Sequence, residues 1–255
     1  MESRRNLNTT IIACALAAAA CTSQATVYVG TLAVSTASPP PPPPQTSGGG
    51  ECDHEYFPMG EDTTWEYASS SNILGDDRTT RTITEERDDG FTMTQRTSTG
   101  DVVLNLTYAC TDGGLILLDP MQQFFAGSAT GASGQAIITT QGQSGITLPA
   151  DLRAGLTWQQ YVEGTVSGPD VTLHMTYTFD NVARGLEAVT VPLGTFDAMR
   201  VDTETQGTLE GEASGTCQTS TWYVKDIGVV KEITICAIGA SAIEVPIELQ
   251  SYDSP

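Results

Sequence analysis

The chain has 255 residues, with 31 acidic and 11 basic side chains and a formal net charge of −20 at pH 7. Because binding to nucleic acid and to anionic headgroups depends on basic residues, this charge excludes a nucleic-acid partner. The acidic residues are scattered, and no D-x-D-x-D-G loop brings together the oxygen ligands that calcium needs. We therefore expect neither a metal site nor a cofactor.

The first 20 residues have the layout of a secretory signal. Two arginines precede an apolar stretch that begins at Leu7 and ends in small residues before Cys21. A cysteine at the cleavage point resembles the lipobox of bacterial lipoproteins, in which that cysteine is lipidated and becomes the mature N-terminus. We predict a signal peptide over 1–20 and a lipid anchor on Cys21, on the extracytoplasmic face of a bacterial membrane. A signal that is only cleaved, or one that is retained as an anchor, is the alternative.

Residues 21–50 have the composition of a tether rather than of a folded segment. Six consecutive prolines occupy 39–44, and residues 45–50 include three glycines. Prolines form an extended rod of about 3.1 Å per residue, roughly 19 Å here, whereas glycines allow free rotation. We expect this segment to hold the folded part, 51–255, away from the membrane.

The folded part has strand signals throughout. Residues 171–179 alternate apolar side chains with threonines and His174, which is typical of a half-buried antiparallel strand. Residues 243–249 repeat the alternation, and Pro246 favours an edge strand there. Further strands are predicted at 92–96, 102–109 and 115–118, a short helix around 121–126, and a flexible connection at 127–145. The predicted fold is all-β, with one or two curved antiparallel sheets of half-barrel or sandwich type.

Two weak echoes indicate an internal duplication. Residues 58–67 resemble 149–161, since both lead from a proline through a turn to a Trp. Residues 108–116 resemble 222–230, and both contain an Asp followed by glycine in a hairpin turn. Chance similarity is the alternative.

The duplication would divide the folded part into halves at 51–126 and 146–255. Curved sheets built from two such halves would bury the three tryptophans together, namely Trp65, Trp158 and Trp222.

Four cysteines lie beyond the signal, and an even number in an exported chain suggests disulfides. Strands are predicted at 216–224 and 229–238. If Val224 faces Val229, then Cys217 lies directly opposite Cys236, within disulfide range. Elimination then pairs Cys52 with Cys110. A zinc site on 52–55 is the alternative, but the residues lack zinc spacing.

The same hairpin register predicts which face of these two strands points to the core. The side chains that share that face are Trp222, Val224, Val229, Ile233 and Ile235.

Three segments, 56–67, 191–201 and 222–231, resemble a set of uncharacterised bacterial secreted proteins and lipoproteins. Their recurring signature is P-x-x-x-G-x-x-W-x-Y, then G-T-F-x-A-x-x-V, then W-Y-x-x-G-V-G-x-V-K. In this chain, Ile227 replaces the valine that the family prefers in the third segment. The resemblance covers residues 52–250 and implies an antiparallel β domain, but it brings no catalytic residues.

The sequence contains no established catalytic motif. No G-x-S-x-G elbow occurs, and His54 and His174 both have a structural interpretation. Glu66 and Glu163 adjoin the repeated Trp–Tyr units, where a hydrolase of polysaccharide or peptide could place its two carboxylates. We expect instead a non-enzymatic, membrane-tethered binding or scaffold module. Its ligand-binding residues are unknown, and its expected partners are the membrane, an apolar ligand or a component of the cell envelope.

Overall fold

The computed structural model describes residues 52, 54–71, 75–98, 103–125, 137–167, 172–209, 214–238 and 241–255. The predicted signal peptide at 1–20, the lipidation site Cys21 and the tether at 21–50 all lie outside these residues. Within them, no helix is both long and apolar enough to cross a membrane.

The described residues form one large antiparallel sheet, which confirms the predicted fold class. Its strand order is β6-β8-β9-β10-β11-β12-β13-β1-β2-β3-β4-β5-β7, so the chain meanders from β8 to β13 and again from β1 to β5. The elements are β1 (Thr64–Ser71), β2 (Gly75–Arg87), β3 (Gly90–Thr97), β4 (Val103–Thr111), β5 (Gly114–Leu117), α2 (Pro120–Phe125), β6 (Ile137–Ser144), β7 (Leu148–Pro149), β8 (Thr157–Ser167), β9 (Thr172–Val191), β10 (Gly194–Leu209), β11 (Ser214–Val224), β12 (Gly228–Ile238) and β13 (Ser241–Asp253).

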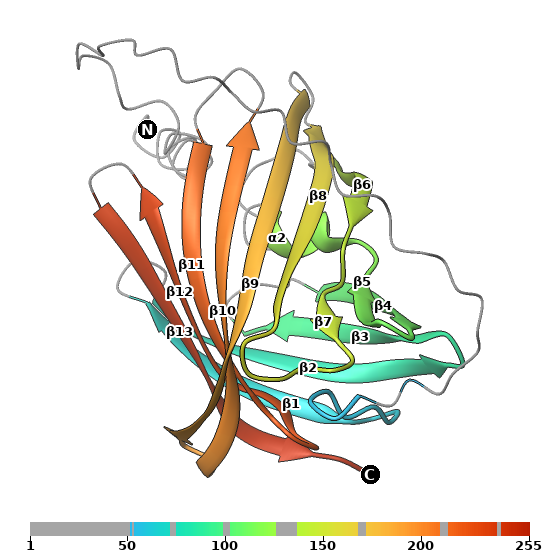
Figure 1. Ribbon diagram of the computed structural model, residues 1–255, viewed down its shortest axis with the longest axis vertical. Helices are drawn as coiled ribbons and strands as arrows, with labels where there is room; N and C mark the ends of the chain where they lie inside the picture. The colour runs from blue at the N-terminus through green and yellow to red at the C-terminus, as the bar shows by residue number, and fades with distance from the viewer. Residues whose placement is uncertain are drawn as a thin grey trace, which may run out of the picture.

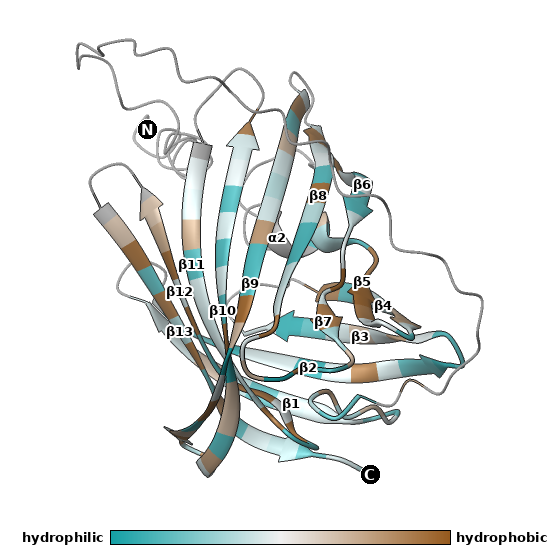
Figure 2. Ribbon diagram, viewed as in Figure 1, coloured by the Kyte–Doolittle hydropathy of each residue, from teal (hydrophilic) through white to brown (hydrophobic). Residues whose placement is uncertain are grey.

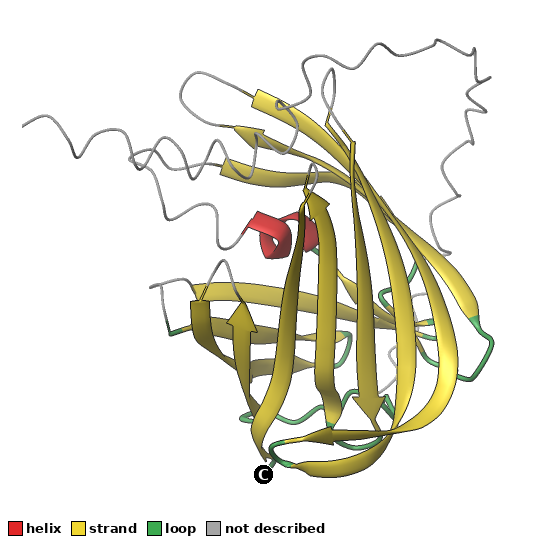
Figure 3. Ribbon diagram, turned by 90° about the vertical axis from the view of Figure 1, so that its left-hand side faces the viewer, coloured by secondary structure: helices red, strands yellow, loops and turns green. Residues whose placement is uncertain are grey.

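The sheet is curved into a cup but is not closed. The long strands β8–β13 lie roughly along one common axis, and β1–β5 cross them at a steep angle (Figure 1). At one end the segment from β6 to β7 connects the two edges, because β6 pairs with β8 and β7 pairs with β5. At the other end the two groups of strands diverge, and α2 lies between them (Figure 3). The fold is therefore a half-barrel with one joined end and one open end.

The hydrophobic core fills the joined end. Its side chains come from both groups of strands and face one side of the sheet, which we call the inner face. Its largest fully buried members are Ile83, Phe91, Leu106, Val230 and Leu249. Strands alternate hydrophobic and hydrophilic residues along their length (Figure 2), as expected when one face is packed and the other is hydrated.

The short helix α2 rests on the inner face through Met121. It can approach the sheet because residue 164 is a glycine: a Cβ there would lie 2.8 Å from Cγ of Met121. Met121 is fully buried, so this side chain packs the helix against β8. The predicted helix is confirmed, with its start at Pro120.

Two sequence predictions about strands are wrong. Residues 137–144, expected within a flexible connection, form β6; residues 126–136 lie outside the described part. β13 was expected at an edge because of Pro246, yet it pairs with both β12 and β1. The ladder with β1 ends at Ile247, so the neighbouring Pro246, which has no N–H group, is tolerated there.

Both predicted disulfides are present. Cys217 bonds to Cys236 with their Cα atoms 4.1 Å apart, and Cys52 bonds to Cys110 with their Cα atoms 5.5 Å apart. The first two cysteines lie directly opposite each other in the ladder of β11 and β12. The second bridge ties the N-terminal segment of the folded part to β4.

The turn that led to this pairing differs from the one expected. Val224 faces Gly228 rather than Val229, and a β-bulge between Trp222 and Tyr223 restores the expected register further along. The turn shifts the register by one residue and the bulge shifts it back by one, so the two cysteines still face each other.

The predicted core face of β12 is wrong. The inner face carries Glu232 and Thr234, because Glu232 is paired with Ile247 and Thr221. Ile233 and Ile235 lie on the outer face, where Ile235 is 41% exposed.

The loops that lead into β1 and β8 share one backbone pattern. Asp62 N–H donates to the carbonyl of Ile83, and Gly155 N–H donates to the carbonyl of Ala183. Both residues have positive φ and stand three positions before a Trp. The pattern repeats the sequence echo in three dimensions, while the duplication itself and its two halves stay predictions.

The three tryptophans are not buried together. Trp65 is buried on the inner face and Trp158 is partly buried. Trp222 lies on the opposite face of the sheet, since its register connects it through Lys231 and Glu248 to the outer side of β1.

Candidate ligand-binding site

The structure does not bring the carboxylates of Glu66 and Glu163 together. Glu66 accepts a hydrogen bond from Ser251 Oγ at 2.8 Å, and Glu163 accepts one from Tyr161 Oη at 3.0 Å. Their strands, β1 and β8, are separated by the five strands β9–β13, which is roughly 29 Å along the sheet at about 4.8 Å per step. The paired carboxyl groups of glycosidases lie within about 5–10 Å of each other. A hydrolase built on these two residues has no support.

The histidines have structural surroundings. His54 is buried, and its Nδ1 accepts a hydrogen bond from Tyr56 N–H at 3.1 Å. The proton is therefore on Nε2, which donates to the carbonyl of Pro149 at 3.0 Å. This ring fastens the N-terminal loop to β7. His174 is exposed on the outer face of β9. Among the described residues, no three His, Cys, Asp or Glu side chains gather as a metal site.

Towards the open end, the inner face carries apolar side chains that are only partly buried. Leu173 and Met175 of β9 and Ile243, Val245 and Ile247 of β13 form what we call the inner apolar surface. The first four of these lie outside the core cluster.

Two aromatic rings continue the row on β9. Tyr177 and Phe179 stack with ring centroids 6.3 Å apart, and burial raises the pKa of Tyr177 to about 12. Between β9 and β13, the inner face carries the Cys217–Cys236 disulfide and several threonines, of which Thr219 and Thr234 share a hydrogen bond at 3.0 Å. The surface is thus apolar at its flanks and carries hydroxyl groups along its middle.

One arginine points inward from β2. Arg81 stands opposite Trp65 and Gln95 in the ladders, and its Nε donates to Gln95 Oε1 at 2.8 Å. Its guanidinium lies over the ring of Tyr67, 5.0 Å from the centroid, which is within the range of a cation–π contact.

One glutamate points inward from β12. Glu232 accepts a hydrogen bond from the Thr221 hydroxyl, and burial raises its pKa although the charge of Arg81 opposes this. Among the described residues, no direct ion pair joins Arg81 to Glu232. Both side chains are partly reached by solvent, and the charge of each affects the ionisation of the other.

Three tyrosines complete this polar cluster. Tyr67, Tyr108 and Tyr223 approach it from β1, β4 and β11, and burial raises the pKa of each. The pKa of Tyr67 rises to about 12, and its hydroxyl donates a hydrogen bond to the carbonyl of Val229 at 2.9 Å. These hydroxyls are therefore neutral and can act as hydrogen-bond donors or acceptors.

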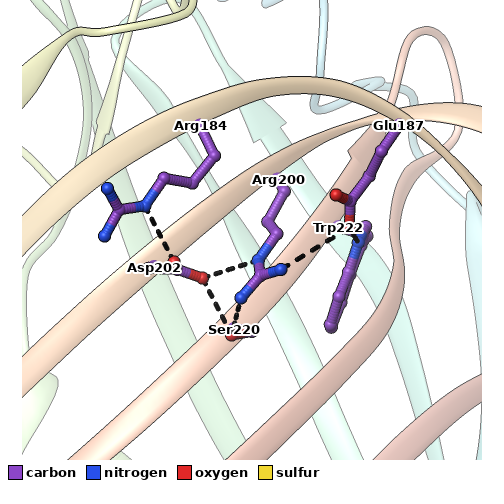
Figure 4. A network of polar contacts seen from close by, with 6 residues as sticks. All are labelled: Arg184, Glu187, Arg200, Asp202, Ser220 and Trp222. Atoms are coloured by element: carbon purple, nitrogen blue, oxygen red, sulfur yellow. Dashed lines mark hydrogen bonds and ion pairs between the residues drawn. The ribbon is translucent and has the colours of Figure 1, made fainter.

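A second polar network lies on the outer face and has a structural role (Figure 4). Asp202 accepts hydrogen bonds from Arg200 Nε at 2.7 Å, Arg184 Nε at 2.8 Å and Ser220 Oγ at 2.8 Å. Arg200 also lies 5.4 Å from the ring of Trp222. Because these residues stand on β9, β10 and β11, the network fastens three adjacent strands.

Replacing Asp202 with asparagine should destabilise the protein by about 1 kcal/mol at pH 7, and by less as the solution becomes more acidic. Burial raises the pKa of Asp202, but hydrogen bonds from Arg200, Ser220 and Arg184 outweigh it and lower the pKa below its usual value. A lowered pKa stabilises the folded state above the unfolded pKa of about 4, and this contribution is lost as the pH falls through the folded value.

Urea unfolding at pH 7 and pH 3 measures this difference. Asp197→Asn, at an exposed position on the same strand, is the matched control and should have little effect at either pH. An equal loss for Asp202→Asn at both pH values would contradict the assigned role of its charge.

Sequence reasoning missed Arg81 and Glu232. Arg81 could have been found, because it shares one face of β2 with Thr79 and Ile83. Glu232 could not, because the apolar residues Ile233 and Ile235 made the opposite face of β12 the expected core face.

Comparison with known proteins shows the fold. No protein-family model and no curated protein matches the sequence. A protein of Bacteroides fragilis, assigned as exported and as having a YmcC-like fold, is 13% identical with a TM-score of 0.56, over 79% of this chain and 100% of that one. A protein of Parabacteroides distasonis, assigned as a lipoprotein, is 15% identical with a TM-score of 0.57, over 78% and 99%. This chain is thus similar in fold to an exported protein with a YmcC-like fold and to a lipoprotein.

Proposed function

We propose that this protein is a lipid-anchored, extracytoplasmic binding module that takes an apolar ligand on its inner face. The observation that carries the proposal is the inner apolar surface. Leu173, Met175, Ile243 and Val245 remain partly exposed at the open end of the cup, although they stand on the same face as the core. Exposed apolar surface of this kind is typical of ligand or partner sites.

Three features support the location outside the cytoplasm. The sequence begins with a signal-like segment before Cys21, and the folded part holds two disulfides, which persist in oxidising compartments. The two proteins of similar fold are assigned as exported and as a lipoprotein. The tether at 21–50 would then let the cup face away from the membrane.

The same geometry favours binding over catalysis. The carboxylates of Glu66 and Glu163 are far apart, and both ring nitrogens of His54 are occupied by structural hydrogen bonds. The polar cluster of Arg81 and Glu232 faces the inner apolar surface, which suits a ligand that has both a polar and an apolar part.

The anchor is tested by mass spectrometry of Cys21 in the membrane fraction. We expect the cysteine to be the acylated N-terminus, and Cys21→Ser to move the protein to the soluble fraction. An unmodified Cys21 in a protein that still sediments with membranes would contradict lipid anchoring.

The binding surface is tested with the uncharged fluorescent probe N-phenyl-1-naphthylamine and the full chain carrying Cys21→Ser. Met175→Lys should weaken probe binding at least tenfold, because it places a charge on the inner apolar surface. His174→Lys, one residue away on the outer face, is the matched control and should bind as the parent does. Equal binding by both variants would rule out this surface.

A further inference from the structure

We propose that Arg81 and Glu232 form the polar end of the binding site and that the ligand is an amphiphile with one carboxylate, such as a long-chain fatty acid. This inference rests on the proposed function and adds the chemical class of the ligand. It is drawn from the place of the two charges on the inner face and from the groups around them.

The apolar row on β13 leads directly to the charged pair. Ile247 stands opposite Glu232 in the ladder, and Val245 and Ile243 continue on the same face towards the open end. Successive side chains on one face of a strand are about 6.6 Å apart, so this row extends roughly 13 Å. A chain lying along it would place its head beside Glu232 and Arg81.

The head group must be an anion that a single arginine can hold. The Nε of Arg81 is engaged by Gln95, and the guanidinium lies against Tyr67, but no carboxylate of the described residues forms an ion pair with it. The planar fork of arginine matches a carboxylate in two parallel hydrogen bonds. The hydroxyl groups of Tyr108 and Tyr223 lie close enough to Arg81 to affect its ionisation and can add donors.

The surrounding charge selects one negative charge rather than two. The protein as a whole carries a net charge of −20, so an anion is repelled from its outer surface and gains most beside an inward-facing arginine. Glu232 lies within electrostatic range of Arg81 and already offsets part of its charge. With Glu232 ionised, a phosphate with two charges would leave two uncompensated negative charges at this site, whereas a monocarboxylate would leave one and is therefore repelled less.

Because Glu232 competes with the ligand for Arg81, the two residues should affect affinity in opposite directions. Arg81→Gln should weaken the binding of a carboxylate at least tenfold. Glu232→Gln should tighten it severalfold, because it removes the competing charge and keeps the shape of the side chain. A structural role alone would make both variants weaker binders.

The experiment uses the full chain with Cys21→Ser at pH 8, which favours the ionised forms of Glu232 and the probe. Cis-parinaric acid and its methyl ester are titrated by fluorescence, so that charge is the main difference between the two probes. We expect the acid to bind the parent at least tenfold more tightly than the ester, and this ratio needs no variant. Arg184→Gln and Glu204→Gln, on the outer face, are the matched controls and should leave the ratio unchanged.

The outcomes separate the two proposals. Loss of the acid preference in Arg81→Gln, together with tighter acid binding by Glu232→Gln, supports the inference. Equal affinity of the parent for acid and ester, or weaker acid binding in Glu232→Gln, would overturn the inference and leave the apolar binding surface standing. No binding of either probe to the parent would overturn both.

Discussion

Removing the Cys52–Cys110 disulfide, by changing both cysteines to alanine, should lower the free energy of unfolding by about 4 kcal/mol. The two cysteines are 58 residues apart, so the bridge restricts a long loop in the unfolded chain. It also ties the segment before β1 to β4, across the first meander of the sheet. Urea unfolding of the double variant, monitored by tryptophan fluorescence, gives the loss directly.

The matched control is the second bridge. Cys217 and Cys236 are 19 residues apart, and the same entropic relation gives about 3 kcal/mol for their removal. The longer loop should therefore produce the larger loss. If removal of the Cys217–Cys236 bridge proves the more damaging, loop entropy is not the main contribution of these disulfides.

Replacing Phe91 with alanine should cost about 4 kcal/mol of stability, the usual range for deleting a fully buried aromatic ring. Phe91 is 0% exposed in the core at the joined end of the cup. Its ring stacks on Tyr108 with centroids 4.8 Å apart and on Phe57 with centroids 5.3 Å apart. The deletion removes both contacts and leaves a cavity that the paired strands β3 and β4 cannot easily close.

Phe196→Ala is the control for this substitution, because Phe196 is only partly buried at the edge of the core. We expect this variant to lose about half as much stability, since folding removes less apolar area from water at position 196 than at position 91. Calorimetry or urea unfolding compares the two variants. A loss at position 91 no larger than that at position 196 would show that the core does not lie where the structure puts it.

The two ends of the cup differ in how completely their inner face is filled. The joined end is filled by aromatic and aliphatic side chains and should account for most of the stability. The open end keeps apolar side chains partly exposed, and between it and the core stand an inward arginine and glutamate that a purely structural core would not need. Buried or half-buried charges without a direct partner are costly, and such groups are found most often at functional sites.

Local patterns in the sequence were enough for much of the fold. Alternation over 171–179 is a property of neighbouring residues, and it correctly predicted which side chains of β9 face inward. The even number of cysteines and the short hairpin between β11 and β12 predicted both disulfides. These features need no information from distant parts of the chain.

What the sequence by itself determined is therefore the strand-rich antiparallel character, the cystine pairing and the inward face of the longest strand. The tertiary structure alone decided that β13 is central, that the face of β12 carrying Glu232 is the inner face, and that Arg81 lies within electrostatic range of Glu232. The physical reason is that side-chain alternation is local, whereas strand order, and with it the face that becomes buried, depends on pairing between segments more than a hundred residues apart, such as β1 and β13.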